Sequence, residues 1–383
     1  MPHAAARLAV TAVLVTAAAA CTGTPPAPQG AAVEVSRGRC GVGWAAPHGG
    51  DQRIAVHNVG PVTMEVELVD PATHGVYAEI ESLAPAATRA VHLVLARGAY
   101  AFTCLPEDSD AETGPAVTVA DGPTAGATAI APVTEDDLGP AVGSYRAHVT
   151  AGLAALAVDV ATLRTALASG DRERARQAWL VAQMAYNRLG AAYDTFGDTA
   201  DAIDGLPDGL PAGVRDKDFT GLRRIEYGLW HGEALPSLGA LAARLASDVA
   251  GLRRDFASSR TDPNDLPLRA HEILENTLQF ELTGAADQGG GAGLATMSAN
   301  LDGTRAVLDA IAPELRPRYA GWTTVEQELS AVQRLVAAQQ RGGRWTPVRE
   351  LSTQDRERLD GALGQLLEDL APIAAIGEVR RTQ

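Results

Sequence analysis

Two hydrophobic patterns divide the chain of 383 residues. From residue 33 to about residue 120, apolar and polar residues alternate, as in the run from Met64 to Leu68. A period of two predicts short β-strands with one buried face. Turn residues, such as those from Asn58 to Pro61, separate the segments at the spacing of antiparallel strands. The pattern therefore predicts a small β-sandwich over residues 33–120.

The later part of the chain has the three- and four-residue spacing of amphipathic helices, first from Val142 to Ala168. Residues 121–140, rich in glycine, proline, alanine and acidic residues, are predicted to form a linker. The glycine run 289–291 is expected to be a flexible hinge. The predicted fold is multidomain: an antiparallel β-sandwich, then an all-α domain over residues 141–376. Further helices are expected at 171–195, 219–232, 237–257, 267–283, 294–312, 316–341 and 353–372, which suggests two bundles.

The first 21 residues have the pattern of an export signal. Arg7 supplies a positive charge, the apolar stretch from Leu8 to Ala20 follows, and Cys21 comes directly after three alanines. This resembles a bacterial lipobox, although the usual leucine at its first position is missing. We expect a signal peptide over 1–21, lipid on Cys21 and a flexible tether over 22–32. An unlipidated protein with an ordinary cleaved signal peptide is the alternative.

The cysteine count agrees with an exported, lipid-anchored protein. Three cysteines leave an odd one in an oxidising compartment unless Cys21 is modified. Cys40 and Cys104 are then free to pair, and closing their loop would stabilise the fold by roughly 4 kcal/mol in the entropic account. No stretch after Cys21 is expected to be long and apolar enough to span a membrane. Lipid on Cys21 would therefore hold the protein at the membrane, facing the periplasm or the cell exterior.

The formal net charge of -15 restricts the classes of partner. A non-specific nucleic-acid binder needs a dense basic surface to displace the counterions of phosphates, so we expect no nucleic-acid partner. A negatively charged composition suits a protein that binds cations better than one that binds nucleic acid. Carboxylates are hard oxygen donors suited to ions such as iron, manganese, calcium or magnesium.

Several short motifs lie between residues 186 and 230: Tyr186 to Leu189, Thr195 to Asp198, Ile203-Asp204 and Gly221 to Trp230, followed by His271 to Glu275. In this order they resemble the imelysin-like, peptidase M75-type domain shared by imelysins and the iron-uptake lipoproteins EfeO and EfeM. The N-terminal segments Ala84-Pro85 and Gly98 to Tyr100, with Asn58, Glu65, Glu67 and Cys104, resemble the cupredoxin-like domain of EfeO. The resemblance covers nearly the whole chain after the signal peptide.

This resemblance implies a metal site built on a His-x-x-Glu motif, and the chain departs from it. Arg223 stands where the family has histidine, three residues before Glu226, and Gly190 replaces an expected glutamate. Arginine cannot coordinate a metal ion and stays protonated, so Arg223 and Glu226 are expected to neutralise each other. The remaining metal hypothesis rests on the carboxylates of Asp194, Asp198 and Glu226. The alternative is that these residues only end a helix or pair with arginine.

Two further groups of polar residues are weaker candidates for a metal site. His271 and Glu275 lie four residues apart on one helix face and extend the metal hypothesis, but a zinc protease would need a second histidine. We favour a solvent-facing helix start there. In the β-region, Glu65 and Glu67 share one face of a strand, and Glu79 and Glu81 share one face of another strand. A second cation site is conceivable, but the solvent-facing side of a half-buried sheet is the favoured interpretation. Blue copper is not expected, because the residues after Cys104 lack the ligands.

The residues and the resemblance together predict an extracytoplasmic lipoprotein that binds iron, or another metal ion, for an EfeUOB-like uptake system. Zinc and copper suit the site less well. The resemblance implies an iron permease and a haem-peroxidase-like component as partners. One alternative is a metallopeptidase-like enzyme, which Arg223 weakens, so no catalytic residue is assigned. The other is a non-metal module in which Arg223 and Arg224 bind an anionic ferric chelate or a protein partner. A guanidinium in the middle of the acidic group, pairing with every acid around it, would refute the carrier hypothesis in this form.

Overall fold

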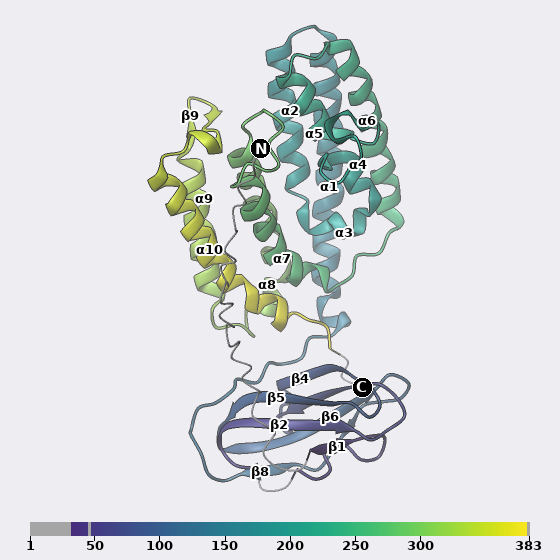
Figure 1. Ribbon diagram of the computed structural model, residues 1–383, viewed down its shortest axis with the longest axis vertical. Coiled ribbons are helices and arrows are strands. Elements are labelled where there is room, and N and C mark those ends of the chain that lie inside the picture. The colour runs from purple at the N-terminus through teal and green to yellow at the C-terminus, as the bar shows by residue number, and fades with distance from the viewer. Residues whose placement is uncertain (1–31, 45–46, 381–383) are drawn as a thin grey trace, which may run out of the picture.

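The computed structural model describes residues 32–44 and 47–380. Within these residues, antiparallel sheets occupy the N-terminal part and helices occupy most of the rest (Figure 1). The predicted fold class, a β-region followed by a helical domain, is confirmed. The expected signal peptide, the lipid on Cys21 and the tether up to residue 31 lie outside the described residues.

Two sheets pack face to face in the β-domain. One has the order β1-β2-β5, with β1 parallel to β2, and the other has the order β4-β3-β6-β7, with β8 also paired to β6. The strands are β1 (Val33–Val35), β2 (Gly50–Asn58), β3 (Met64–Val69), β4 (Val76–Leu83), β5 (Thr88–Leu95), β6 (Gly98–Pro106), β7 (Glu112–Thr113) and β8 (Val117–Val119).

The alternation along β3 fixes which side chains face the interior of the β-domain. Met64, Val66 and Leu68 are buried in the apolar core between the sheets. Because side chains on a strand alternate, Glu65 and Glu67 lie on the opposite face of the same sheet. The core also contains the predicted Cys40–Cys104 disulfide, which is confirmed, with 5.8 Å between the Cα atoms.

The helical domain follows the predicted helices with several shifted boundaries. A short hairpin of β9 (Gln340–Arg341) and β10 (Arg344–Trp345) shortens the helix expected over 316–341. The helices are α1 (Glu135–Ala168), α2 (Arg172–Asn187), α3 (Tyr193–Phe196), α4 (Asp198–Asp204), α5 (Gly221–Trp230), α6 (Leu235–Ser258), α7 (Asp265–Asn276), α8 (Gly293–Leu315), α9 (Trp322–Ala337) and α10 (Thr353–Ile376).

Helix α1 begins at Glu135, inside the segment expected to be a linker, rather than at Val142. A capping box explains the earlier start: the Thr134 hydroxyl accepts from the Asp137 backbone N-H, and the Asp137 carboxylate accepts from the Thr134 backbone N-H. By length and composition α1 could cross a membrane, so the expectation that no later segment meets this criterion is wrong. Its buried residues recur at helical spacing and face α2 and α6, as in the core helix of a bundle.

The segment after α2 departs from the predicted continuous helix to residue 195. Helix α2 ends at Asn187, and a 3-10 turn (Gly190–Ala192) and two short helices follow. Gly190 lies at the break, where a Cβ atom would meet the Ile273 side chain at 3.0 Å. Close packing of this turn against α7 therefore favours glycine at position 190 and redirects the chain.

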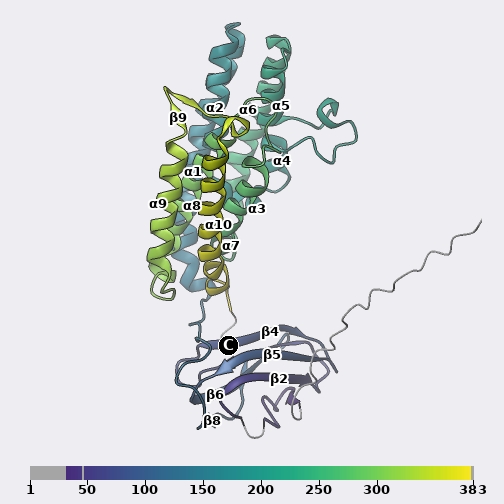
Figure 2. The same ribbon diagram turned by 60° about the vertical axis from the view of Figure 1, so that its left-hand side comes forward.

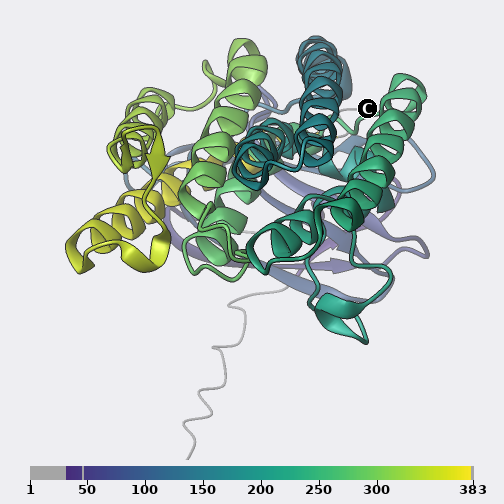
Figure 3. The same cartoon turned by 90° about the horizontal axis from the view of Figure 1, so that it is seen from above.

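Helices α1, α2, α5 and α6 form one group, and α7, α9 and α10 form another (Figures 1 and 2). Helix α8 contacts α1, α2, α7 and α9, and one apolar cluster runs through both groups. Viewed from above, the blue to teal helices lie on one side and the green to yellow helices on the other (Figure 3). The expected two bundles thus share a single core.

The two domains meet where the chain leaves α10. Arg380 donates its backbone N-H to the carbonyl of Val133 at 2.8 Å, next to the start of α1. Its side chain reaches β4, where Nε lies 3.0 Å from Glu79 Oε2. The C-terminal segment therefore contacts both the helical domain and the outer face of the β4-β3 sheet.

Replacing Cys40 and Cys104 together with serine should lower the free energy of unfolding of the β-domain by about 4 kcal/mol, because the loop that they close becomes unconstrained in the unfolded chain. Hydrogen exchange of the amides in β3 and β6 should accelerate accordingly. Exchange in α1 serves as the internal control and should change little. Unchanged exchange in β6 would contradict this role of the disulfide.

Candidate functional site

Arg223 lies in the first turn of α5 and is only 4% exposed. The helix starts at Gly221, whose φ of +74° lies in the left-handed region. A Cβ atom at this position would stand 2.2 Å from the carbonyl oxygen of Ile203, so the close approach of α4 requires glycine. This contact places Arg223 beside the end of α4 and inside the helical domain.

Three carboxylates surround the Arg223 guanidinium. Nε lies 3.2 Å from Asp204 Oδ1, and Nη2 donates to Glu281 Oε1 at 2.6 Å. Nη1 lies 3.6 Å from Glu226 Oε2. The three acids come from α4, from a π-helical turn (Thr277–Glu281) after α7, and from α5 itself. The positive charge therefore occupies the position between the carboxylates that a metal ion would need.

A single guanidinium does not balance three ionised carboxylates, so a proton on one or more of these acids would lower the free-energy cost of burying them. Burial raises the pKa of Asp204, Glu226 and Glu281, while the Arg223 charge opposes the rise in each case. For Glu226 the pKa is raised to about 8, and the neighbouring Asp287 adds to the effect of burial. Arg223 itself stays protonated, since its pKa is raised above the ordinary arginine value by Asp204, Glu281 and Glu226 against the effect of burial.

The glycine run after α7 covers Glu226. The backbone N-H groups of Gln288 and Gly290 donate to Glu226 Oε1 at 3.1 and 3.0 Å. A Cβ atom on Gly290 would stand 2.8 Å from the same oxygen, so a larger residue would push the carboxylate away. The expectation that this run is a simple flexible hinge is wrong, because its backbone fixes one oxygen of a fully buried carboxylate.

A cavity of about 140 Å³ lies beside the Arg223 cluster. Arg223, Asp204 and Glu281 form part of its wall, and the remaining lining includes polar amide side chains: Asn187, Asn276 and Asn300. A small polar molecule or several waters would fit this volume. The carboxylates that face the cavity are already engaged with Arg223.

The structure separates the other expected metal ligands from Glu226. Asp194 accepts from Arg269 Nε at 2.9 Å, and Asp198 is exposed at the first residue of α4. His271 Nδ1 lies 3.8 Å from Glu275 Oε2 on α7. In the described part of the chain, none of the groups of three or more potential ligands within 4.8 Å of one another includes these residues. The proposed set does not converge, because arginines rather than a common ion neutralise Asp194 and Glu226.

The arginines of the chelate hypothesis are engaged as well. Arg224 Nη2 donates to Glu233 Oε2 at 3.0 Å, and its guanidinium lies 5.7 Å from the centre of the Tyr227 ring. Arg223 is held by the three acids described above. An anionic ligand would have to displace these carboxylates from both side chains, so the pair does not form a ready anion site.

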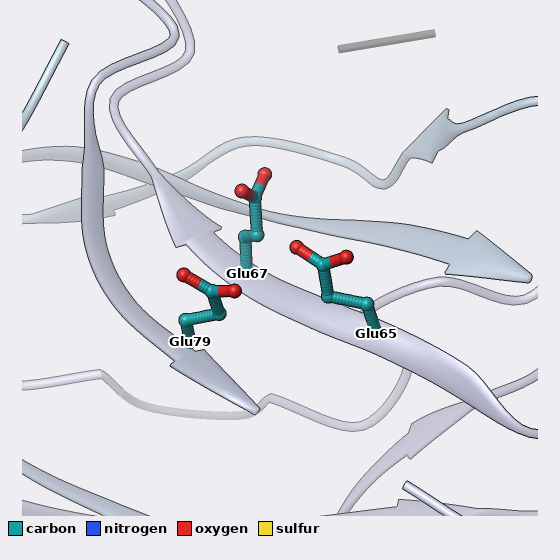
Figure 4. A group of neighbouring side chains, drawn as sticks. All are labelled: Glu65, Glu67 and Glu79. Carbon is teal, nitrogen blue, oxygen red and sulfur yellow. The ribbon is translucent and has the colours of Figure 1, made fainter. Parts of the chain in front are cut away.

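A second acidic cluster lies in the β-domain. Glu67 on β3 stands directly opposite Glu79 on β4, and Glu65 lies beside them (Figure 4). Their ligand atoms lie within 4.8 Å of one another. Burial raises the pKa of both Glu65 and Glu67 to about 7, and the charge of Glu79 adds to it. Glu67 is only 5% exposed, so the expectation of a solvent-facing row is wrong for this residue.

Sequence reasoning missed several members of these clusters. Glu281 belongs to the π-helical turn after α7, which the helical periodicity did not distinguish from an ordinary helix end. Arg380 follows the last helix by a few residues and has no motif around it. Asp204 lies near the predicted acidic group in sequence, but its pairing with Arg223 depends on the packing of α4 against α5. These residues come together through contacts between distant segments, which no local pattern reports.

A sequence profile of the imelysin family matches residues 141–371, most of the helical domain. The chain is 26% identical over 253 residues to the iron uptake system component EfeM of Pseudomonas syringae pv. syringae (strain B728a), covering 66% of this chain and 88% of that protein. It is 24% identical over 240 residues to the iron uptake system component EfeO of Escherichia coli (strain K12), covering 62% of this chain and 64% of that protein. The chain thus spans less than two thirds of EfeO. It belongs to the imelysin family, and EfeM and EfeO are similar to it over 66% and 62% of its length.

Replacing Arg223 with methionine should lower the free energy of unfolding by about 3 to 5 kcal/mol, because the buried carboxylates lose their counter-charge. The loss should be larger at pH 8 than at pH 5. Without the guanidinium the pKa values of these acids rise further in the folded state, and stability then falls as the pH rises through them. Urea unfolding at the two pH values measures both effects.

Arg224→Met is the matched control, since its pair with Glu233 is partly exposed and should be worth less than about 1 kcal/mol. Equal losses for the two variants at both pH values would show that Arg223 does not neutralise the buried acids.

Proposed function

We propose that this protein is an exported, membrane-tethered component of an iron uptake system, in which it captures iron and presents it to a permease. The observation that supports this most strongly is the imelysin-family helical domain, whose relatives EfeM and EfeO are named as iron uptake components. The net charge of -15 favours attraction of cations. An iron permease and a haem-peroxidase-like component are the partners that the family resemblance implies.

The Arg223 cluster limits how this capture can work. A permanent cation stands between Asp204, Glu226 and Glu281, so these carboxylates do not offer an open position to iron. The proposal therefore assigns the helical domain a scaffold and docking role around this closed cluster. Iron, as cargo, would be held by oxygen donors elsewhere on the protein.

A metallopeptidase role has less support. A catalytic zinc ion needs protein ligands and an open position for water. Arg223 replaces one expected ligand, and its guanidinium lies beside Glu226, where the ion would bind. We therefore propose a binding protein without catalytic turnover.

Deleting the gene in the source organism should lower the initial rate of uptake of radiolabelled iron by iron-limited cells several-fold. The physical reason is that the captured ion would no longer be concentrated beside the transporter. Expression of the wild-type chain should restore the rate, and manganese uptake serves as the control for general damage to the envelope. Normal iron uptake in the deletion strain would contradict the proposed function.

Replacing Arg223 with histidine should create a metal site that the wild-type protein lacks, because the change removes the built-in cation and adds a nitrogen ligand beside three carboxylates. Calorimetry with Fe²⁺ and Zn²⁺ should show one more bound ion than the wild type. At a metal concentration of 100 times the dissociation constant, that ion should raise the free energy of unfolding by about 2.7 kcal/mol.

The double variant Arg223→His with Glu226→Gln is the control and should lose the added ion. Proteolysis by the zinc-loaded single variant would favour a peptidase ancestry over a carrier. No added binding would show that the carboxylates are held apart by more than the arginine.

A further inference from the structure

The β-domain buries negative charge without an adequate counter-charge. Glu67 and Glu79 are register partners on antiparallel strands, and like charges directly opposite each other destabilise a sheet. Glu65 adds a third carboxylate from the same face of β3. The sheet keeps three acids together at a point where each would favour a positive neighbour.

The Glu67 side chain forms no hydrogen bond or ion pair with the described residues, and the charge of Arg380 acts on it only in part, against burial and Glu79. The Oε1 atom of Glu67 is buried and, among the described residues, has no hydrogen-bond partner; Oε1 of Glu65 is in the same state. A Glu67 carboxylate oxygen lies within 4.8 Å of an oxygen of each of the other two acids (Figure 4). A buried carboxylate oxygen without a donor costs free energy, so this side chain itself indicates a missing positive ligand.

Arg380 supplies part of the counter-charge from the C-terminal segment. Its Nε atom lies 3.0 Å from Glu79 Oε2, and its Nη2 atom lies 3.4 Å from Glu378 Oε2. Arg380 is therefore shared between two acids and turns toward one edge of the cluster. A divalent cation would supply most of the positive charge that Glu65, Glu67 and Glu79 lack, since Arg380 also pairs with Glu378.

We propose that Glu65, Glu67 and Glu79 form a binding site for a hard divalent cation, with Arg380 as a fixed counter-charge at its edge. The donors are carboxylate oxygens, which suit Fe²⁺, Mn²⁺, Mg²⁺ or Ca²⁺ better than ions that prefer nitrogen or sulfur ligands.

The spacing fits such an ion. Ligand atoms opposite each other on an octahedral ion are about 4.2 Å apart, for bonds of about 2.1 Å, and adjacent ones are closer. The carboxylate oxygens already lie within 4.8 Å of one another, so small side-chain adjustments would close the site. The Glu79 side chain is partly exposed and leaves a route for the ion and for water ligands.

Only the choice of iron as cargo rests on the proposed function; the site itself rests on the geometry of the β-domain. A second acidic group, Glu79 with Glu81 and Glu378, lies beside the first and offers a competing position. Its members are more exposed, and Arg380 already pairs with Glu79 and Glu378. We therefore favour the group that contains Glu67.

Calorimetric titration of the purified chain from residue 22 onward with Mn²⁺, and with Fe²⁺ under anaerobic conditions, tests this proposal. The wild type should bind one ion in the β-domain, and Glu67→Gln should weaken binding about tenfold or more, because it removes the central charged ligand. Glu67→Gln keeps the side-chain shape, and without metal it should unfold at a temperature no lower than the wild type. Its loss of binding would then not reflect misfolding.

Glu81→Gln is the matched control, since Glu81 lies on β4 near the cluster but outside the proposed ligand set. Its binding should equal that of the wild type. Absence of binding by the wild type at millimolar Mn²⁺ and Fe²⁺ would overturn the proposal. So would unchanged binding in Glu67→Gln, or a loss in Glu81→Gln alone, which would place the ion in the second group.

The outcomes for site and function are separable. Binding that depends on Glu67, combined with normal iron uptake in the deletion strain, would support the site and refute the iron-uptake role. If Glu67→Gln binds metal as the wild type does and fully restores iron uptake in the deletion strain, the site is refuted and the uptake role stands.

Discussion

Buried carboxylates that require a positive charge govern the interior chemistry of this protein. In the helical domain, Asp204, Glu226 and Glu281 converge on Arg223, and in the β-domain Glu65, Glu67 and Glu79 converge beside Arg380. Removing such acids from water is costly unless a cation or a proton compensates them. The two domains meet this requirement differently, since the first encloses a guanidinium between its three acids and the second has Arg380 only at one edge of its cluster.

The helical cluster contains its own counter-charge. A guanidinium and a metal ion both neutralise surrounding acids, but the guanidinium is covalently attached and cannot be released. The backbone N-H groups of Gln288 and of Gly290 in the glycine run hold Glu226 and keep the cluster closed. The internal cation of this helical domain is therefore part of the chain itself.

Arg380, at the contact between the two domains, lies beside the acidic cluster of the β-domain. Arg380 follows α10, pairs by its backbone with Val133 near the start of α1, and reaches Glu79 on β4. A cation at Glu65, Glu67 and Glu79 would therefore lie next to the junction of the two domains. Because Glu79 belongs to both interactions, an ion at that site would share this carboxylate with Arg380 of the C-terminal segment.

Local patterns in the sequence determined the alternating strands around Met64 to Leu68, the helical spacing after residue 142, the pairing of Cys40 with Cys104 and the inability of Arg223 to bind a metal. These features depend on periodicity, residue chemistry or counting. Tertiary structure alone decided that Glu281 joins Arg223 and that Arg380 meets Glu79 across 301 positions of sequence. It also decided that Glu67 is buried. Burial and long-range pairing arise when distant segments pack together, and the spacing of neighbouring residues contains no record of that packing.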